Sequence, residues 1–510
     1  MNQKKRGIKI SARIIVTALI ILSELAFISY IAFKLSVASL IVYICAELLG
    51  VFTSIHIITV RGNQDYKVMW IIFILVFPVL GVLSYLLWGG GRVFPHYKKR
   101  MERCTDKYLS SLPDDFLADS RLLYEDMIHS RQAEFLRNYG DFRIYDNTSS
   151  EFFAPCENLM PQLLDDLKNA EKFIFIEFFI LAEGKMWGAI HNILKQKAEN
   201  GVDVKIIFDD FGSANRQNKN FVHNLINEGI GVSVFNPIKP SIDLFMNNRN
   251  HRKIIVIDGK TAYTGGFNIA DEYINQFERF GYWMDCAIRI TGNAVKSFTA
   301  MFAAMWEFNS RDEINMDFHT AESEQIDDGL YIPYCDSPLD GNKASAEGIY
   351  LQILNTARKY VYITTPYLIL SNSFISALIM AAKSGIDIRI ITPHIPDKKY
   401  VHLVTQSYYN DLLEAGVRIF EYTPGFIHSK LFVSDDSVAT VGTVNVDFRS
   451  FYLHFECGVW VCKSKSVKDI KEKFEDIQKD STEINLKEWK KRSMLSKFSQ
   501  RLLRLFAPYM

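Results

Sequence analysis

The chain has 510 residues, with 58 Lys and Arg against 58 Asp and Glu, so its formal net charge is zero. This balance provides no overall attraction to nucleic acid and leaves only local basic patches to attract an anionic surface. The seven cysteines are scattered without a C-x-x-C pair, which favours reduced thiols over a disulfide framework.

Residues 1–91 are predicted to be a transmembrane region. Three apolar runs, Ile14–Phe33, Val37–Val60 and Val68–Trp88, are each long enough to cross a hydrocarbon core of about 30 Å. Basic residues flank both the first and the third run, and the positive-inside rule places both flanks in the cytoplasm. Because that requires an even number of crossings, we expect one of the three runs to be re-entrant or interfacial.

Residues 92–135 are rich in charge and helix formers and are predicted to be a helical linker. An internal repeat follows, with a first half at 136–325 and a second half at 326–482. Residues 198–207 match 382–391, and 231–235 match 416–420. Each half alternates strand and helix, which predicts two α/β sandwich halves related by pseudo-symmetry, each with a largely parallel sheet.

One set of polar residues occurs in both halves with identical spacing, H-x-K-x(4)-D-x(6)-G-x-x-N. The first copy comprises His251, Lys253, Asp258, Gly265 and Asn268. The second copy lies 177 positions later and comprises His428, Lys430, Asp435, Gly442 and Asn445. Two copies in one chain are unlikely to arise by chance, so we predict one functional site at the junction of the halves.

The residue types in the repeated set suit chemistry on a phosphodiester. Lysine supplies a fixed positive charge, and asparagine supplies a neutral donor for the non-bridging oxygens. Histidine serves as a nucleophile or as a general acid and base near neutral pH. The repeated set contains no cluster of Asp and Glu that would bind a metal ion, and its two lysines can supply the positive charge that a metal would provide. We therefore predict no cofactor.

Carboxylates fall into two groups. Asp258 and Asp435 belong to the predicted catalytic set, but they lie an odd number of positions from the histidines and point to the other face of an unbroken strand. A structural role therefore fits them better. A nucleophilic histidine also needs a carboxylate at its other ring nitrogen, and we predict Asp285 and Glu456, each the acid of a mostly apolar run, as the histidine-orienting residues.

The repeated motif resembles that of the phospholipase D superfamily and, within it, the bacterial cardiolipin synthases. Residues 250–259 with 265–273, and 425–430 with 441–451, carry the resemblance, which extends over nearly the whole chain. The family often has serine after the motif glycine, where this chain has Gly266 and Thr443. Thr443 therefore joins Asn268 and Asn445 as a predicted phosphate-binding residue, whereas Gly266 has no side chain for such a contact.

The resemblance implies a two-step transfer between two phosphatidylglycerol molecules in a lipid bilayer. One histidine displaces glycerol from the first lipid, and the terminal hydroxyl of the second lipid resolves the phosphatidyl-histidine. Many superfamily members use the amino-terminal histidine as nucleophile, which is His251 here, but the two motifs are nearly equivalent and leave the order open. The resemblance implies a multi-pass protein of the bacterial cell membrane with a cytoplasmic catalytic domain.

Three other functions are alternatives to this interpretation. A phospholipase D that hydrolyses lipid, or exchanges another headgroup, would use the same residues. A nuclease is disfavoured by the apolar runs and by the lack of a strongly basic catalytic region, and a non-catalytic scaffold is disfavoured because both motif copies are intact. The sequence predicts no oligomeric state.

The tail, residues 483–510, is basic, and Leu495, Phe498, Leu502 and Leu505 follow helical spacing. This pattern predicts an amphipathic helix that lies either on a membrane surface or against the domain.

Overall fold

The computed structural model describes residues 26, 37–60, 64–89, 95–113, 127–238, 244–316, 328–340 and 343–509. The first predicted apolar run lies outside these residues apart from Ala26. The chain forms two compact units, residues 1–95 with 238–247 and residues 96–237 with 248–510. The predicted boundaries of the linker, the halves and the tail stay predictions.

The first unit contains a small helical assembly. Its helices are α2 (Val37–Thr59), α3 (Gln64–Val76), α4 (Pro78–Ser84) and the short turn η1 (Tyr85–Gly89), with a further turn, η3, at Leu244–Asn247. Ile57, Trp70, Ile74 and Val82 belong to its core.

Among the described residues, one helix is long and apolar enough to cross a membrane, Leu40–Thr59. The apolar run at Val68–Trp88 does not form one continuous helix, because α3 ends at Val76 and a new helix begins at Pro78. Proline lacks the amide hydrogen that would continue the helix.

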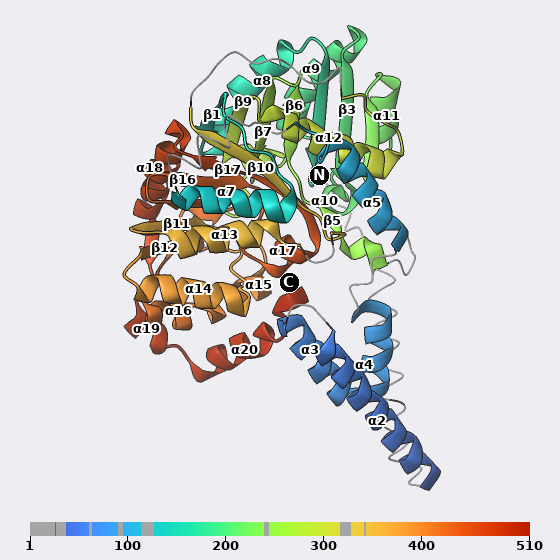
Figure 1. The fold of residues 1–510 in the computed structure, drawn as a ribbon, viewed down its shortest axis with the longest axis vertical. Helices are drawn as coiled ribbons and strands as arrows, with labels where there is room; N and C mark the ends of the chain where they lie inside the picture. The colour runs from blue at the N-terminus through green and yellow to red at the C-terminus, as the bar shows by residue number, and fades with distance from the viewer. Residues whose placement is uncertain are drawn as a thin grey trace, which may run out of the picture. The chain divides into compact units, whose positions relative to one another are not determined.

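The first half of the second unit is built on a seven-stranded sheet in the order β1-β9-β7-β6-β2-β3-β4 (Figure 1). The strands are β1 (Thr148–Phe153), β2 (Phe173–Phe178), β3 (Asp203–Asp209), β4 (Gly231–Phe235), β6 (Ile254–Ile257), β7 (Thr261–Gly265) and β9 (Ala287–Gly292). The helices of this half are α8 (Met160–Lys168), α9 (Lys185–Glu199), α10 (Asp210–Ser213), α11 (Phe221–Asn227) and α12 (Val295–Ser310), with the short turns η2 (Cys156–Leu159) and η4 (Asp271–Ile274).

The second half repeats this arrangement in a sheet ordered β10-β17-β16-β15-β11-β12-β13-β18. The strands are β10 (Leu330–Asp336), β11 (Tyr360–Thr364), β12 (Asp387–Pro393), β13 (Arg418–Tyr422), β15 (Leu431–Ser434), β16 (Val438–Gly442), β17 (His454–Cys462) and β18 (Ser481–Glu483). The helices are α13 (Ser345–Thr356), α14 (Asn372–Lys383), α15 (Lys399–Ser407), α16 (Tyr409–Ala415), α17 (Phe448–Tyr452) and α18 (Lys465–Lys479).

The predicted α/β halves are confirmed, but the largely parallel sheet is not. β2, β3 and β4 are parallel, as are β11, β12 and β13, whereas the motif strands and the strands beyond them are antiparallel. The reason lies in the turns after the motif strands, where Asp258 and Asp435 adopt left-handed φ values of 54° and 56°. Such tight turns join antiparallel neighbours, whereas parallel neighbours need a long crossover.

Two short strand pairs connect the halves directly. β5 (Arg249–Asn250) of the first half pairs with β17 of the second. In return, β14 (Gly425–Ile427) of the second half pairs with β8 (Tyr282–Met284) of the first. Nearly every residue of α12 is buried, and this helix contacts strands of both sheets.

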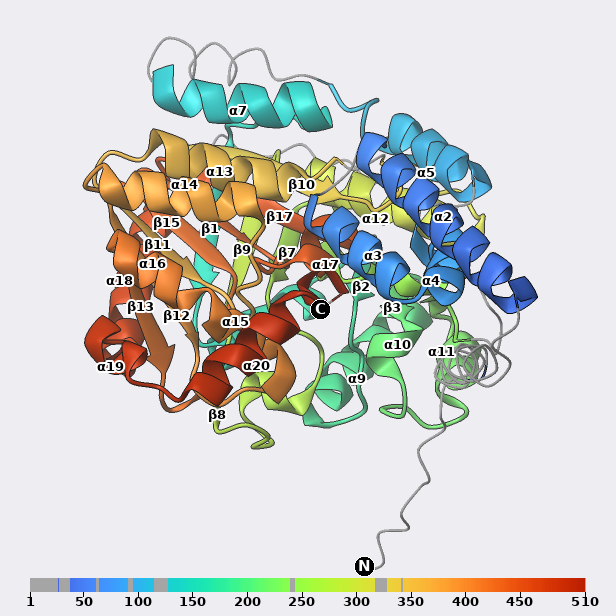
Figure 2. The ribbon, with the colours of Figure 1, turned by 90° about the horizontal axis from the view of Figure 1, so that it is seen from below.

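The remaining helices of this unit pack on the two halves. α5 (Pro95–Tyr108) is held by Lys107 and Tyr108, which both contact Glu307 of α12. α7 (Met127–Gly140) packs on α13. α5 lies within the segment predicted as a linker, and α7 begins in it and ends just beyond it. The tail forms α19 (Leu486–Lys490), α20 (Met494–Arg504) and η5 (Ala507–Tyr509), and α20 lies along α15 (Figure 2).

Candidate active site

Both motif histidines lie where the chain passes from one half to the other. His251 follows β5, which pairs with the second half, and precedes β6 of the first sheet. His428 follows β14, which pairs with the first half, and precedes β15 of the second sheet. The backbone amide of His251 donates to Phe455, and that of His428 to Met284. These crossings bring both histidines to the junction of the halves.

The crossing exchanges the carboxylates that contact the histidines. Nδ1 of His251 lies 2.9 Å from a carboxylate oxygen of Glu456, which belongs to the second half. Nδ1 of His428 lies 2.7 Å from Asp285, which belongs to the first half. Each imidazole therefore donates from Nδ1 to the acid of the other half, and its Nε2 is left as the reactive nitrogen.

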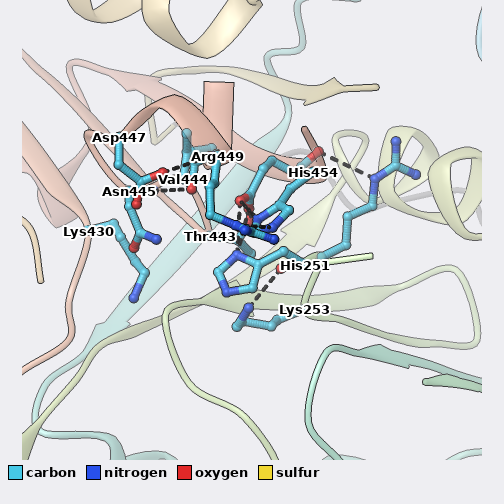
Figure 3. Close-up of polar contacts among 12 residues, drawn as sticks. His251, Lys253, Lys430, Thr443, Val444, Asn445, Asp447, Arg449 and His454 are labelled. Carbon is cyan, nitrogen blue, oxygen red and sulfur yellow. Dashed lines mark hydrogen bonds and ion pairs between the residues drawn. The ribbon is translucent and has the colours of Figure 1, made fainter. Parts of the chain in front are cut away.

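The motif lysines lie beside the histidines of their own half. Nζ of Lys253 donates to the carbonyl oxygen of His251 at 2.7 Å (Figure 3). Nζ of Lys430 likewise donates to the carbonyl oxygen of His428. Nζ of Lys430 also lies 2.9 Å from Nδ1 of His428, whose proton we assign to the bond with Asp285 because a carboxylate only accepts. Both side chains are buried.

Burial and mutual repulsion shift the pKa values of these groups together. Burial, then Lys430, lowers the pKa of His428 to about 4, and burial, then Lys253, holds the pKa of His251 well below its usual range. Burial lowers the pKa of Lys253 to about 7 and that of Lys430 to about 8. Charged groups of each motif also shift pKa values in the other motif, so the two histidines and two lysines form one site. This site has too little negative charge to balance its positive groups.

The two acids differ in their electrostatics. Burial raises the pKa of Glu456 well above its ordinary value, against the opposing effect of Lys253. Burial also acts on Asp285, but His428 and Lys430 outweigh it and lower the pKa of Asp285 below its ordinary value. Asp285 is therefore ionised beside His428, whereas Glu456 retains a proton more readily beside His251.

The motif aspartates Asp258 and Asp435, which the sequence groups with the catalytic set, contact backbone amides and not the histidines, as the structural role predicted for them requires. The carboxylate of Asp258 accepts the backbone amides of residues 171–173 at 2.7–2.9 Å. Asp435 accepts those of residues 358–360 at 2.7–3.0 Å. The chain turns at each aspartate, so the side chain reaches the start of the neighbouring strand, β2 or β11, instead of the site.

The predicted phosphate-binding residues have different surroundings. Oδ1 of Asn268 accepts the amide of Ile180 at 3.0 Å, and its Nδ2 donates to Tyr273 at 2.7 Å. Oδ1 of Asn445 is buried and has no hydrogen-bond partner in the described part of the chain. The hydroxyl of Thr443 donates to Glu456, which explains its role more directly than a phosphate contact does.

Gly266 occupies the corresponding place in the first half. A Cβ atom there would lie 2.1 Å from Oδ1 of Asp285. The residue after the motif glycine therefore lies against the acid of its own half, which in turn bonds to the histidine of the other half. Thr443 makes this contact through its hydroxyl, and Gly266 through close packing of its backbone.

Comparison with known proteins agrees with this geometry. The family model described as "Cardiolipin synthase, PLD-like domain" matches residues 163–306 and 350–478, more than half of the chain. A second model, "Phospholipase_D-nuclease N-terminal", matches residues 48–90. A "Cardiolipin synthase" of Staphylococcus aureus is 33% identical over 91% of this chain and 94% of its own length.

The chain belongs to the cardiolipin synthase family of phospholipase D-like proteins. A "Cardiolipin synthase 2" of Staphylococcus epidermidis is 32% identical over 90% of this chain and 95% of its own. The phosphatidylserine synthase of Haemophilus influenzae shares the fold, with a TM-score of 0.55 and 15% identity over 74% of this chain and 97% of that one.

Within this family framework, the two histidines have unlike neighbours that sequence reasoning missed. His454 packs on His251 with ring centroids 5.3 Å apart, and Trp283 packs on His428 at 5.5 Å. Both residues precede their acids by two positions. The signal was present in the sequence, since His454 and Trp283 occupy equivalent places in the repeat and differ in chemistry.

His251, His454 and Glu456 also form the one group, among the described residues, with donor atoms placed to hold a metal ion, all within 4.8 Å of one another. Positive charge on Arg449 and Lys253 lowers the pKa of His454, after burial. The same positive charge would repel a metal cation, so the surroundings fit an anion better than a metal.

Proposed function

We propose that this protein is a cardiolipin synthase, which transfers the phosphatidyl group of one phosphatidylglycerol to a second and releases glycerol. The observation that carries this proposal is the pair of histidines, each held by the other half's acid and flanked by a lysine, in one buried site of a family member. A phosphodiester is the substrate class that such a set suits.

The proposed reaction has two displacements. Nε2 of one histidine attacks the phosphorus, the P–N bond forms, and the bond to the glycerol oxygen breaks as the other imidazolium donates a proton to it. The terminal hydroxyl of the second phosphatidylglycerol then gives its proton back to that imidazole while its oxygen attacks phosphorus and the P–N bond breaks. Mapping the trapped phosphatidyl group to a peptide assigns the nucleophile.

The roles of the other residues follow from their positions. Lys253 and Lys430 neutralise the non-bridging oxygens, and Asn268 and Asn445 donate to them. Asp285 and Glu456 fix the histidine tautomers and stabilise the imidazolium. Asp258, Asp435 and Thr443 support this arrangement without touching the phosphate.

The test uses the full-length protein in detergent and lipid micelles with phosphatidylglycerol as the sole lipid substrate and a chelator present. Mass spectrometry follows cardiolipin, glycerol and phosphatidic acid. We expect cardiolipin and glycerol in equal amounts. Phosphatidic acid as the main product would instead make the protein a hydrolase.

We further propose that the protein is a multi-pass protein of the bacterial cell membrane with its catalytic unit in the cytoplasm. The helix Leu40–Thr59 and the basic flanks of the amino-terminal region support the membrane part. The substrate class supports it too, because phosphatidylglycerol resides in the bilayer. Labelling of cysteines introduced at 100 and 480 in intact and in opened cells tests the orientation, and labelling in intact cells would contradict it.

The tail helix α20 supports a contact with the membrane surface. Gln500 and Arg504 bond to Gln406 and Asp411, so the polar side of the helix faces the domain. The apolar side faces outward, with Leu495 75% and Phe498 65% exposed, and Arg501 is exposed nearby. An exposed apolar stripe with basic neighbours fits an anionic lipid surface.

Replacing both Leu495 and Phe498 by Glu tests this contact. We expect lower activity on phosphatidylglycerol in vesicles and retained activity on phosphatidylglycerol in detergent, with Lys479→Glu on α18 as control. Equal activity of parent and variant on vesicles would overturn the contact.

A further inference from the structure

A second group of polar residues lies beside His251. The register of β5 and β17 sets Arg249 opposite His454. Nε of Arg449, on α17, donates to Nε2 of His454 at 3.3 Å, and the His454 ring lies against that of His251 (Figure 3). We call Arg249, His454 and Arg449 the outer cationic cluster.

The charges of this cluster are incompletely matched by protein partners. Nη1 of Arg249 lies 3.4 Å from Asp209 and donates to the carbonyl oxygen of Asn236 at 2.9 Å. Within the described residues, these are the polar contacts of its guanidinium. The Nη atoms of Arg449 have no hydrogen-bond or ion-pair partner among the described residues. Nδ1 of His454 is buried, lies 3.4 Å from Glu456 and makes no hydrogen bond in this part of the chain.

The electrostatics of the cluster agree with its geometry. Burial lowers the pKa of Arg449, and Arg249 lowers it further, although Asp447 opposes the shift. Burial also raises the pKa of Asp209, the acid beside Arg249, to about 6, which weakens its compensating charge. Buried positive groups of this kind are stabilised by an anion that the protein itself does not supply.

The other half of the site lacks these charges. Phe426 and Trp283 stand at the positions equivalent to Arg249 and His454, with ring centroids 4.9 Å apart. Glu272 stands where the second half has Arg449, and it is paired with Arg216 and Arg279. Because that side folds with aromatic residues at two of these places and an acid at the third, the repeat does not need the outer cationic cluster for its fold.

We propose that the outer cationic cluster binds a second phosphodiester, the phosphate of the acceptor lipid. This inference rests on the proposed function, in which two phosphodiester monoanions must enter one site. Lys253 and Lys430 then neutralise the phosphate under attack, and Arg249 and Arg449 neutralise the phosphate that lies one glycerol unit from the attacking hydroxyl. A small neutral alcohol has no such phosphate and gains nothing from the cluster.

The test compares two acceptors in one reaction. Full-length protein receives phosphatidylglycerol together with 1-butanol, and mass spectrometry measures cardiolipin and phosphatidylbutanol. In Arg449→Gln we expect the ratio of cardiolipin to phosphatidylbutanol to fall at least about tenfold, the effect of losing one charge-assisted contact. Arg449→Lys keeps the charge and should restore part of the ratio.

Arg279→Gln provides the matched control, since it removes a cation that pairs with Glu272, the residue equivalent to Arg449, while Arg216 still pairs with Glu272. Its product ratio should equal that of the parent. Equal losses of both products in Arg449→Gln, or an unchanged ratio, would overturn the second phosphate site. Phosphatidylbutanol without cardiolipin from the parent protein would instead overturn the proposed function.

Discussion

The two histidines occupy equivalent positions in the repeat but unlike surroundings. His251 is packed by His454, which accepts from Arg449, and bonds to an acid that retains its proton readily. His428 is packed by Trp283, Tyr273 and Phe426 and bonds to an ionised acid. The duplication therefore fixes where the histidines lie, while the neighbours that differ between the halves give each histidine a different electrostatic environment.

Replacing either histidine should have the largest effect. We expect His251→Ala and His428→Ala each to lower cardiolipin formation by at least about 10³-fold, because each removes a nucleophile or an acid-base group from a shared site. Product formation from phosphatidylglycerol measures this. If one variant kept near-parental activity, the two motifs would not act together.

Replacing the acids that contact the histidines should have the next largest effect on activity, and the two effects should differ. We expect Asp285→Asn and Glu456→Gln to lower kcat by about 10²- to 10⁴-fold, since an amide no longer fixes the histidine tautomer. The loss should be larger for Asp285, which carries its full charge, than for Glu456, whose pKa is raised. Steady-state kinetics of both variants at one pH decide the order, and a larger loss at Glu456 would reverse our comparison.

Lysine titration should limit activity at high pH. The pKa of His428 is lowered to about 4 and that of His251 lies well below its usual range, whereas Lys253 loses its charge as the pH rises through about 7 and Lys430 through about 8. We expect the decline of kcat/KM with pH to steepen above pH 7 to 8, where the loss of lysine charge adds to the loss of the imidazolium, since this parameter reports the free enzyme. Lys253→Arg should move this fall to higher pH because arginine stays charged.

The matched control for this profile is Lys260→Arg at the exposed residue two positions after Asp258. Its profile should coincide with that of the parent. A fall in kcat/KM that stays in place in Lys253→Arg would assign it to another group.

The motif aspartates should affect stability and hardly affect activity. Asp258→Ala should lower the free energy of unfolding by about 2–3 kcal/mol, because three backbone amides lose a charged acceptor. Asp258→Asn keeps one acceptor oxygen and tolerates the left-handed turn, so it should cost less. Thermal unfolding measures the loss, and activity per folded molecule should stay near the parental value. A large fall in that activity would return Asp258 to the catalytic set.

Much of this arrangement could be predicted from the sequence. The repeat predicted the strands, and the chemistry of the motif predicted which histidines and acids lie together. The crossing of β5 and β14 between the halves was not predictable, because each strand is only two or three residues long and pairs with a distant segment. Asp285 and Glu456 could therefore be identified as candidates, but not assigned to the opposite histidines.

Other features depend on contacts that a pattern does not encode. Thr443 fits a phosphate contact by residue type, and its hydroxyl is used by Glu456 instead. The amino-terminal run at Val68–Trp88 has the composition of one span, yet Pro78 divides it. His454 lies in an apolar run, where its position relative to His251 becomes visible only after folding.

The most direct test of the composite site mixes the two inactive histidine variants. His251→Ala and His428→Ala are assayed alone and together for cardiolipin from phosphatidylglycerol, at equal total protein. Because both histidines of one site come from a single chain, we predict no cardiolipin above the level of the separate variants. Recovered activity in the mixture would show that sites form between chains and would contradict this account.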